Sequence, residues 1–312
     1  MRVLVAPTSL KGALSAVDAA EALVAGLRRG GADADALPVA DGGDGTLEVL
    51  HRALGGEWRS ARVTAPLGGE LEGTWLLLPP GVCGSEPQSR TAVVESATVL
   101  GFHTVDRLDP VHASSRGLGE LILDAVRDAD ELLVCLGGTV TVDGGAGVRD
   151  AFRVCGSEPQ TQSLSVPTTV ACDVASPLMD AVDVFAAQKG ARPEDFEILR
   201  KRLRGLPDIP GAGAAGGLGG AFAALGAKLV PGAPLVLNLV GFDPSGYDLV
   251  VTGEGAVDET TFTGKAPGEV VRRCREAGVR CELFSARDDF SGGTSRARED
   301  LVAYGERLAR AS

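Results

Sequence analysis

Four glycine-rich segments of the sequence carry residue types suited to binding charged groups. Glycine lets the backbone approach a ligand closely, and carboxylates supply the oxygen ligands that a hard cation prefers. The segments begin at Pro38, Leu136, Pro210 and Asp248. Together they predict a site for a phosphate or another small anion, with a metal ion close by.

The first segment places Asp41 and Asp44 among three glycines, in Pro-Val-Ala-Asp-Gly-Gly-Asp-Gly-Thr. Two carboxylates in a glycine turn predict ligands for a magnesium-bound phosphate. The same pattern suits an acidic turn at a helix start, where aspartates accept free N–H groups and favour the helix dipole. Both interpretations stay open here.

The second segment, residues 136–147, holds five glycines and two threonines directly after an apolar run. An ordinary tight turn needs one or two glycines, so this density favours a cradle of backbone N–H groups around an anion. The residues predicted to line the cradle are Gly137, Gly138, Thr139, Gly144 and Gly145.

The third segment formally contains G-x-G-x-x-G at Gly211, Gly213 and Gly216. A dinucleotide site is not favoured, because no strand precedes the glycines and no acidic residue follows about 20 positions later. We predict a glycine-lined helix start that faces phosphates. Close helix packing is the alternative.

The fourth segment joins an apolar run to Glu254, Asp258 and Lys265. Carboxylates for a metal and a lysine for phosphate are the parts of a nucleotide site, although the spacing is not that of a Walker A loop. A capped loop with a solvated lysine is the alternative. Lysines are scarce in this chain. Lys11 and Lys189 are therefore further candidates to neutralise a substrate carboxylate or phosphate. An ordinary surface role for each is the alternative.

Regular elements must position these segments. Apolar runs predict strands at 2–6, 75–78, 91–95, 131–136, 166–172, 247–252 and 279–285. Helical spacing predicts helices at 15–29, with Ser15 as N-cap, and at 117–127, 221–227, 267–277 and 295–309. The alternation predicts an α/β fold with a parallel sheet and functional loops at the carboxyl ends of its strands. Residues 63–78 instead predict a β-hairpin, and we place a domain boundary near residue 63.

Composition limits the class of protein. A chain of 312 residues suggests about two domains, and a net charge of −12 argues against binding a nucleic-acid backbone. No signal peptide is visible, so we expect a cytoplasmic protein without a membrane span. The uncharged stretch 209–227 is too rich in glycine for a lipid-facing helix. Six cysteines without C-x-x-C and three unpaired histidines speak against a zinc site.

Taken together and in order, the motifs resemble the bacterial glycerate kinase family, whose fold differs from those of ribokinase-like and P-loop kinases. The segments that carry the resemblance are 6–11, 38–46, 116–122, 137–139 with 143–145, 172–178, 188–190, 211–217 and 253–265. They include Ala-Pro-Thr-Ser-Leu-Lys at the first, Cys-Asp-Val-Ala-Ser-Pro-Leu at 172–178 and Gln-Lys-Gly at 188–190.

The resemblance implies phosphorylation of glycerate by ATP with Mg²⁺. It implies a Rossmann-like parallel-sheet domain (1–62 and 248–312), a second α/β domain with a mixed sheet (63–247), and a cleft between them. The expected partners are glycerate and ATP, and a homo-oligomer stays an open alternative. The resemblance implies three groups of site residues. The catalytic residues are Lys11, Asp41, Asp173 and Lys189, and the metal-binding residues are Asp41, Asp44 and Asp258. The nucleotide-binding residues are Gly137, Gly138, Thr139, Gly144, Gly145, Gly211, Gly213, Gly216, Glu254 and Lys265.

Some positions depart from the family pattern. The family usually has aspartate at Thr8, asparagine at Val142 and arginine at Ala256. These changes keep two alternatives open: a kinase for another small hydroxy acid, or an impaired homologue that only binds nucleotide or organic acid.

Overall fold

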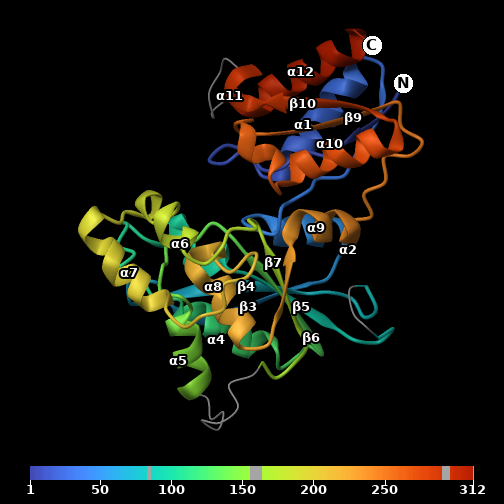
Figure 1. The fold of residues 1–312 in the computed structure, drawn as a ribbon. Coiled ribbons are helices and arrows are strands. Elements are labelled where there is room, and N and C mark those ends of the chain that lie inside the picture. Colours follow the sequence, from blue (N-terminus) through green and yellow to red (C-terminus); the bar gives the residue numbers. More distant parts are fainter. Residues whose placement is uncertain (83–85, 155–163, 290–295, 312) are drawn as a thin grey trace. The chain divides into compact units, whose positions relative to one another are not determined.

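The computed structural model describes residues 1–82, 86–154, 164–289 and 296–311 (Figure 1). The chain divides into two compact units. The first contains Met1–Asp41, Glu48–Ala53 and Ala233–Ser312, and the second contains Gly42–Leu47 and Leu54–Gly232. The chain passes between the units after Asp41, twice within α2 (Thr46–Leu54), and at the first residue of α9 (Gly232–Leu239).

The first unit is built on a four-stranded parallel sheet. The strands follow the order β10-β9-β1-β2, with bounds β1 (Arg2–Val5), β2 (Asp33–Ala36), β9 (Leu249–Glu254) and β10 (Arg280–Ser285). Its helices are α1 (Ala16–Arg29), α10 (Ala266–Ala277), α11 (Ala286–Asp289) and α12 (Ala297–Ala311). In Figure 1, β9 and β10 lie between α12 and α10.

Helix α1 begins where the sequence predicts. The hydroxyl of Ser15 accepts the N–H of Asp18 at 3.1 Å, which satisfies a free donor of the first turn. Its apolar face, including Leu23 and Leu27, is buried with residues of β1, β9 and α12. A Cβ on Gly26 would lie 2.1 Å from the carbonyl oxygen of Val302, so α1 and α12 meet backbone to backbone there.

The second unit is built on a six-stranded mixed sheet. The strands follow the order β3-β4-β5-β6-β7-β8, with bounds β3 (Glu57–Thr64), β4 (Glu70–Leu77), β5 (Thr91–Glu95), β6 (Glu131–Leu136), β7 (Thr168–Cys172) and β8 (Lys228–Pro231). Strands β3 to β5 pair antiparallel, and β5 to β8 pair parallel. The carboxyl ends of four neighbouring strands, β5 to β8, therefore share one edge of the sheet.

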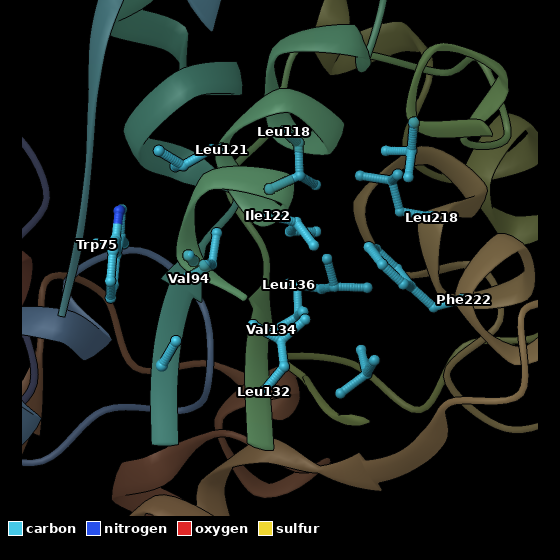
Figure 2. Packing of buried hydrophobic residues seen from close by; sticks show 14 of the residues in the cluster. Trp75, Val94, Leu118, Leu121, Ile122, Leu132, Val134, Leu136, Leu218 and Phe222 are labelled. Carbon is cyan, nitrogen blue, oxygen red and sulfur yellow. The ribbon is translucent and has the colours of Figure 1, made fainter. Parts of the chain in front are cut away.

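Helices cover one face of this sheet and complete its core (Figure 2). Leu118 and Ile122 of α4 (Arg116–Ala125) join Val134 and Leu136 of β6 in one buried cluster, together with Phe222 of α8 (Ala214–Ala224). The alternate residues of β6, such as Leu133, are buried as well. A strand buried on both faces reads as a continuous apolar run, which is why the sequence indicates it clearly.

Shorter helices complete the second unit. They are α3 (Ala97–Leu100), α5 (Ala146–Val154), α6 (Asp180–Asp183) and α7 (Phe196–Leu203), with 3-10 turns at η1 (Phe102–Thr104), η2 (Ala187–Lys189) and η3 (Pro193–Asp195). A smaller apolar cluster includes Leu178, Val182, Leu199 and Leu203. Within the described ranges, no helix is long and apolar enough to cross a membrane.

The predicted α/β class, with one parallel and one mixed sheet, is confirmed. The hairpin is also present, as β3 and β4 around the turn at Gly68 and Gly69. The sequence pattern missed two strands, β2 and β8. The last predicted helix, 295–309, starts outside the described residues and otherwise corresponds to α12.

The predicted domain boundaries and the compact units group some residues differently. Strand β3 pairs with β4 over its whole length, so residues 57–62 group with the second unit instead of with 1–41. Residues 233–247 group with the first unit. The boundaries at residues 62 and 248 stay predictions.

The helix predicted at 221–227 begins earlier, at Ala214 in α8. Its start is not regular, because Ala215, Gly216 and Gly217 all have positive φ. A run of left-handed residues needs glycine at most positions, and this explains why helical periodicity does not mark the segment.

Candidate active site

One loop of the second unit runs along the carboxyl ends of its parallel strands. At Gly42 an added Cβ would lie 2.8 Å from Cα of Gly232, which follows β8, and 3.1 Å from Cβ of Ala171 in β7. Farther along, the N–H groups of Gly45 and Leu47 bond to Glu95, the last residue of β5. The aspartate-glycine segment is thus laid across the strand ends, where α/β proteins place functional loops.

Asp44 and Asp173 each lie close to the glycine turn that follows β6. A Cβ on Gly137 would lie 2.6 Å from Oδ2 of Asp173 and 2.7 Å from Cα of Gly43. A Cβ on Gly138 would lie 3.3 Å from Cβ of Asp44. Three segments that are distant in sequence therefore converge, and a side chain on Gly137 would occupy space that the Asp173 carboxylate now takes.

Glu95 binds the backbone of the loop that carries Asp44. Its two carboxylate oxygens accept the N–H of Gly45 and the N–H of Leu47, each at 3.0 Å. The side chain is buried, and burial raises the pKa of Glu95 to about 7, with the Asp44 charge adding to the rise and the backbone N–H groups opposing it. Glu95 thus fixes the first turn of α2 directly after Asp44.

Ser96 fixes the glycine turn. Its buried hydroxyl donates to the carbonyl oxygen of Gly137 at 3.0 Å and accepts the N–H of the same residue at 3.1 Å. Neighbouring residues at the end of β5 therefore hold two different loops.

Lys189 provides a buried positive charge in the same unit. Its ammonium donates to Oγ1 of Thr139 at 3.1 Å and to the carbonyl oxygen of Thr141 at 2.9 Å. Burial lowers the pKa of Lys189 to about 8, while the charges of Asp173 and Asp143 act in the opposite direction. The side chain is only 4% exposed, so it is not the solvated lysine that composition alone would suggest.

Thr141 adds a hydroxyl with unused capacity. The side chain is fully buried, and its Oγ1 has no hydrogen-bond partner among the described residues. A buried polar group without a partner is costly, and a catalytic role or a bound water or ion can account for one.

Asp143 has a structural task. Its Oδ2 accepts the N–H and the hydroxyl of Ser115 and the N–H of Gly147, while its Oδ1 accepts the N–H of Gly145. It thereby joins the starts of α4 and α5, which explains the acidic residue among the glycines of that loop.

The remaining predicted glycines of this unit pack against protein. Added Cβ atoms would lie 2.2 Å from the Pro177 oxygen at Gly213 and 2.0 Å from the Thr141 oxygen at Gly216. The same applies to Gly144, Gly145 and Gly211, whose added Cβ atoms would meet Leu203, Ala221 and Cys172. Close packing is therefore sufficient to require glycine at these positions, and their contact with a nucleotide stays a prediction.

In the first unit, Lys11 and Glu254 belong to the segments at the carboxyl ends of β1 and β9. Thr8 donates both its N–H and its hydroxyl to the carbonyl oxygen of Gly253, at 3.0 and 3.1 Å. An added Cβ on Gly255 would lie 3.9 Å from the backbone nitrogen of Lys11, whose side chain is exposed. The two loops are therefore neighbours.

Glu254 is the centre of a small polar cluster beside these loops. It accepts the hydroxyl of Thr261 at 2.6 Å, and its other oxygen lies 3.5 Å from the Lys265 ammonium. Asp258 instead caps the turn η4 (Glu259–Phe262), accepting the N–H and hydroxyl of Thr260, and these bonds lower the pKa of the Asp258 carboxyl. Its carboxylate thus has a local structural use, as the alternative interpretation of this segment expects.

The predicted metal ligands are divided between the units. Asp44 belongs to the second unit, while Asp41 and Asp258 belong to the first. In the part of the chain that the structure describes, no three His, Cys, Asp or Glu side chains gather as a metal-binding group. Mg²⁺ often binds through only one or two carboxylates and the substrate phosphates, so Asp44 beside the glycine turn fits such an ion.

Sequence reasoning missed Glu95, Ser96 and Thr141 as members of this site. Glu95 and Ser96 stand at the end of an apolar strand and lie outside the glycine-rich segments. Thr141 lies in the second glycine-rich segment, but nothing in the sequence separates it from the other residues there. Only the fold brings their partners close.

The comparisons with known proteins agree on one family. A family model described as the glycerate kinase family matches residues 3–168 and 153–291. The glycerate 2-kinase of Escherichia coli (strain K12) is 35% identical over 315 residues, covering 86% of this chain and 80% of that protein. The glycerate kinase of Bacillus subtilis (strain 168) is 37% identical over 327 residues, covering 89% and 83%.

A crystal structure is similar over the whole chain. It is that of the "putative glycerate kinase 2" from Salmonella typhimurium LT2, with a TM-score of 0.76 and 29% sequence identity. The similarity covers 100% of this chain and 98% of that one.

Proposed function

The chain belongs to the glycerate kinase family, and we propose that it transfers the γ-phosphoryl group of ATP to a hydroxyl group of glycerate. In this reaction a hydroxyl oxygen of glycerate forms a bond to the γ-phosphorus. The bond from that phosphorus to the β–γ bridging oxygen breaks, giving ADP and phosphoglycerate. Such a transfer needs mainly positioning, charge neutralisation and a group that accepts the hydroxyl proton.

The observation that carries the proposal is that Asp44 and Asp173 each lie close to the turn at Gly137 and Gly138. Carboxylates beside a glycine turn at strand ends suit a phosphate and its metal ion. Lys189 adds a buried positive charge, and Thr141 adds a hydroxyl that has no hydrogen-bond partner among the described residues.

Each residue of the second unit has a proposed task. Asp173 orients the attacking hydroxyl and accepts its proton, and Lys189 neutralises the glycerate carboxylate or the transferring phosphoryl group. Asp44 would hold Mg²⁺, which supplies neutralisation of phosphate charge when bound. Lys11, Asp41, Glu254, Asp258 and Lys265 are proposed to contribute from the first unit.

The test measures ADP formation with and without D-glycerate in the presence of ATP and Mg²⁺, coupled to NADH oxidation. We expect ADP only when glycerate is present. Asp173→Asn should lower kcat by roughly 10²- to 10⁴-fold with a smaller change in KM, because it removes a proton acceptor that works in the transition state. The exposed Asp150→Asn is the matched control and should behave as wild type.

Two outcomes would contradict the proposal. ADP formation with another small hydroxy acid but not with glycerate would assign a different substrate. ATP binding without turnover on any acid would assign a binding role. Unchanged kcat in Asp173→Asn, at unchanged stability, would remove Asp173 from the reaction.

A further inference from the structure

We propose that Glu95 and Ser96 are positioning residues, which together set the spacing between the Asp44 loop and the glycine turn beside Asp173. This inference deepens the proposed function and rests on it. Neither residue belongs to the glycine-acid motifs, and neither needs to touch a substrate. They act through the two loops that they hold.

The Asp44 loop needs external support. Gly42 and Gly45, on either side of Asp44, both have a φ of +88°. Glycine adopts this conformation readily but also adopts many others, so these residues do not by themselves hold the loop in one conformation. Asp44 itself is exposed. Inside the loop the hydroxyl of Thr46 donates to the carbonyl oxygen of Gly43 at 2.7 Å. That bond closes the turn but does not tie it to the sheet.

Glu95 provides the tie. Its carboxylate bridges the N–H groups of Gly45 and Leu47, and these donors lie one and three residues after Asp44. When Glu95 is ionised, above its pKa of about 7, these bonds go to a charged acceptor and are roughly twice as strong as neutral ones. A glutamine in this place would keep one acceptor oxygen and present an NH₂ group to the other donor. One of the two ties would then become a repulsive contact between donors.

Ser96 provides the matching tie on the other side. Its hydroxyl makes two hydrogen bonds with Gly137, one to each backbone group. A Cβ on Gly137 would lie 2.6 Å from Oδ2 of Asp173, so the backbone of Gly137 lies close to the Asp173 carboxylate. A small shift of Gly137 would therefore change the surroundings of that carboxylate. Since Glu95 and Ser96 are adjacent at the end of β5, the two loops are registered against the same rigid strand.

The chain offers a close control for each residue. Ser89 precedes β5 as Ser96 follows it, and its hydroxyl likewise bonds both backbone groups of one residue, Glu86. Asp195 is a buried carboxylate that accepts the N–H of Arg192 near the start of α7. Ser89→Ala removes comparable hydrogen bonds away from the Asp44 and Gly137 loops. Asp195→Asn makes the same carboxylate-to-amide change where a single oxygen accepts from Arg192, so the amide can keep that bond.

The experiment compares Ser96→Ala and Glu95→Gln with Ser89→Ala and Asp195→Asn in the full chain, well below the unfolding temperature. Hydrogen exchange with mass spectrometry follows peptides that cover residues 42–47 and 136–139. Steady-state kinetics with ATP and glycerate gives kcat and KM separately. Ser96→Cys, which keeps the size of the side chain but bonds weakly, replaces Ser96→Ala if that variant does not fold.

We expect Glu95→Gln to speed exchange in 42–47 and Ser96→Ala to speed it in 136–139. We expect both to lower kcat by about 10²-fold with KM changed much less, because misplacing reacting groups by about 1 Å has that effect. The control variants should leave both measurements near wild type.

The outcomes separate this inference from the proposed function. If the wild type shows no glycerate-dependent turnover, the proposed function fails, and exchange in the two segments alone decides whether the pair holds the loops. Unchanged exchange in both variants would overturn the inference. So would faster exchange with wild-type kcat, or a loss of kcat of equal size in the two controls.

Discussion

Lys189 illustrates how burial gives an ordinary side chain a specific use. In water an ammonium needs no partner, but at 4% exposure Lys189 depends on Thr139, the Thr141 carbonyl and the nearby Asp173 and Asp143 charges. A fixed, partly desolvated charge interacts more strongly with an anion than a solvated one does. Its buried position therefore supports the role we propose for it.

The pH dependence of turnover tests the charge on Lys189. Burial lowers its pKa to about 8, so the ammonium is lost as pH rises through that value. We expect kcat/KM to fall above pH of about 8. Lys189→Met should abolish most turnover at every pH, while Lys201→Met, at an exposed position of α7, should keep the wild-type profile. A wild-type profile that stays flat to pH of about 10 would show that the charge is not needed.

The pH dependence of stability tests the environment of Glu95. Its pKa is raised from 4.5 to about 7, so the folded state binds this proton more tightly than the unfolded state. Stability from this group is present below about pH 4.5 and is lost as pH rises through about 7. The total change is on the order of 3 kcal/mol.

Denaturant unfolding at pH values between 5 and 8 measures this effect. The free energy of unfolding of the wild type should fall over this range by more than that of Glu95→Gln, which cannot titrate at this position. Equal slopes for both proteins would contradict the raised pKa.

At the residue scale, sequence indicates chemistry better than it indicates support. Asp44 stands in a glycine-rich segment and Lys189 is one of few lysines, so composition indicates both before any fold is known. Asp173 is indicated only by the family resemblance. Glu95 could not, because its partners Gly45 and Leu47 are about 50 residues away in sequence. Its role exists only once the loop is folded back over the strand ends.

At the scale of elements, the sequence predicts a helix or strand well when it has a regular apolar face or a recognisable capping residue. Helix α1 has both, in Ser15 and a regular apolar face, and its start is confirmed. Strand β2 reads Asp-Ala-Asp-Ala, a composition poor in strand formers, and it is a strand because it pairs with β1 from Arg2 to Val5. Tertiary pairing overrides propensity here. Strand β8 is short and ends in a proline, so the sequence pattern does not predict it either.

The contact between α1 and α12 gives an element-scale prediction. In an isolated helix Gly26→Ala would stabilise by about 1 kcal/mol. In this protein the new Cβ would lie 2.1 Å from the Val302 oxygen, which backbone atoms cannot accommodate without moving. We expect a net destabilisation of about 1–3 kcal/mol, measured by denaturant unfolding.

The neighbouring position provides the control for that prediction. Ala25 is exposed in the same turn of α1, so Ala25→Gly should cost only the propensity difference of about 1 kcal/mol. Stabilisation by Gly26→Ala would mean that the two helices are farther apart than the structure has them.

At the scale of the whole molecule, two compact units each have a core and a sheet whose strand ends carry predicted site residues. The sequence was sufficient for the α/β class, the hairpin and the family, because apolar runs and ordered motifs span the chain. It was not sufficient for the grouping of residues 57–62, which follows from the pairing of β3 with β4. The first half of β3 is exposed and mostly polar, so no apolar run marks where the strand begins.

The most direct test of the account is the identity of the product. The purified protein is mixed with ATP, Mg²⁺ and D-glycerate, and the reaction is followed by ³¹P NMR. We predict that the γ-phosphate signal of ATP is replaced by a phosphomonoester signal of 2- or 3-phosphoglycerate, together with ADP. Its coupling to the glycerate protons identifies which hydroxyl is phosphorylated. Formation of inorganic phosphate alone, or no loss of ATP by a correctly folded protein, would contradict the proposed kinase activity.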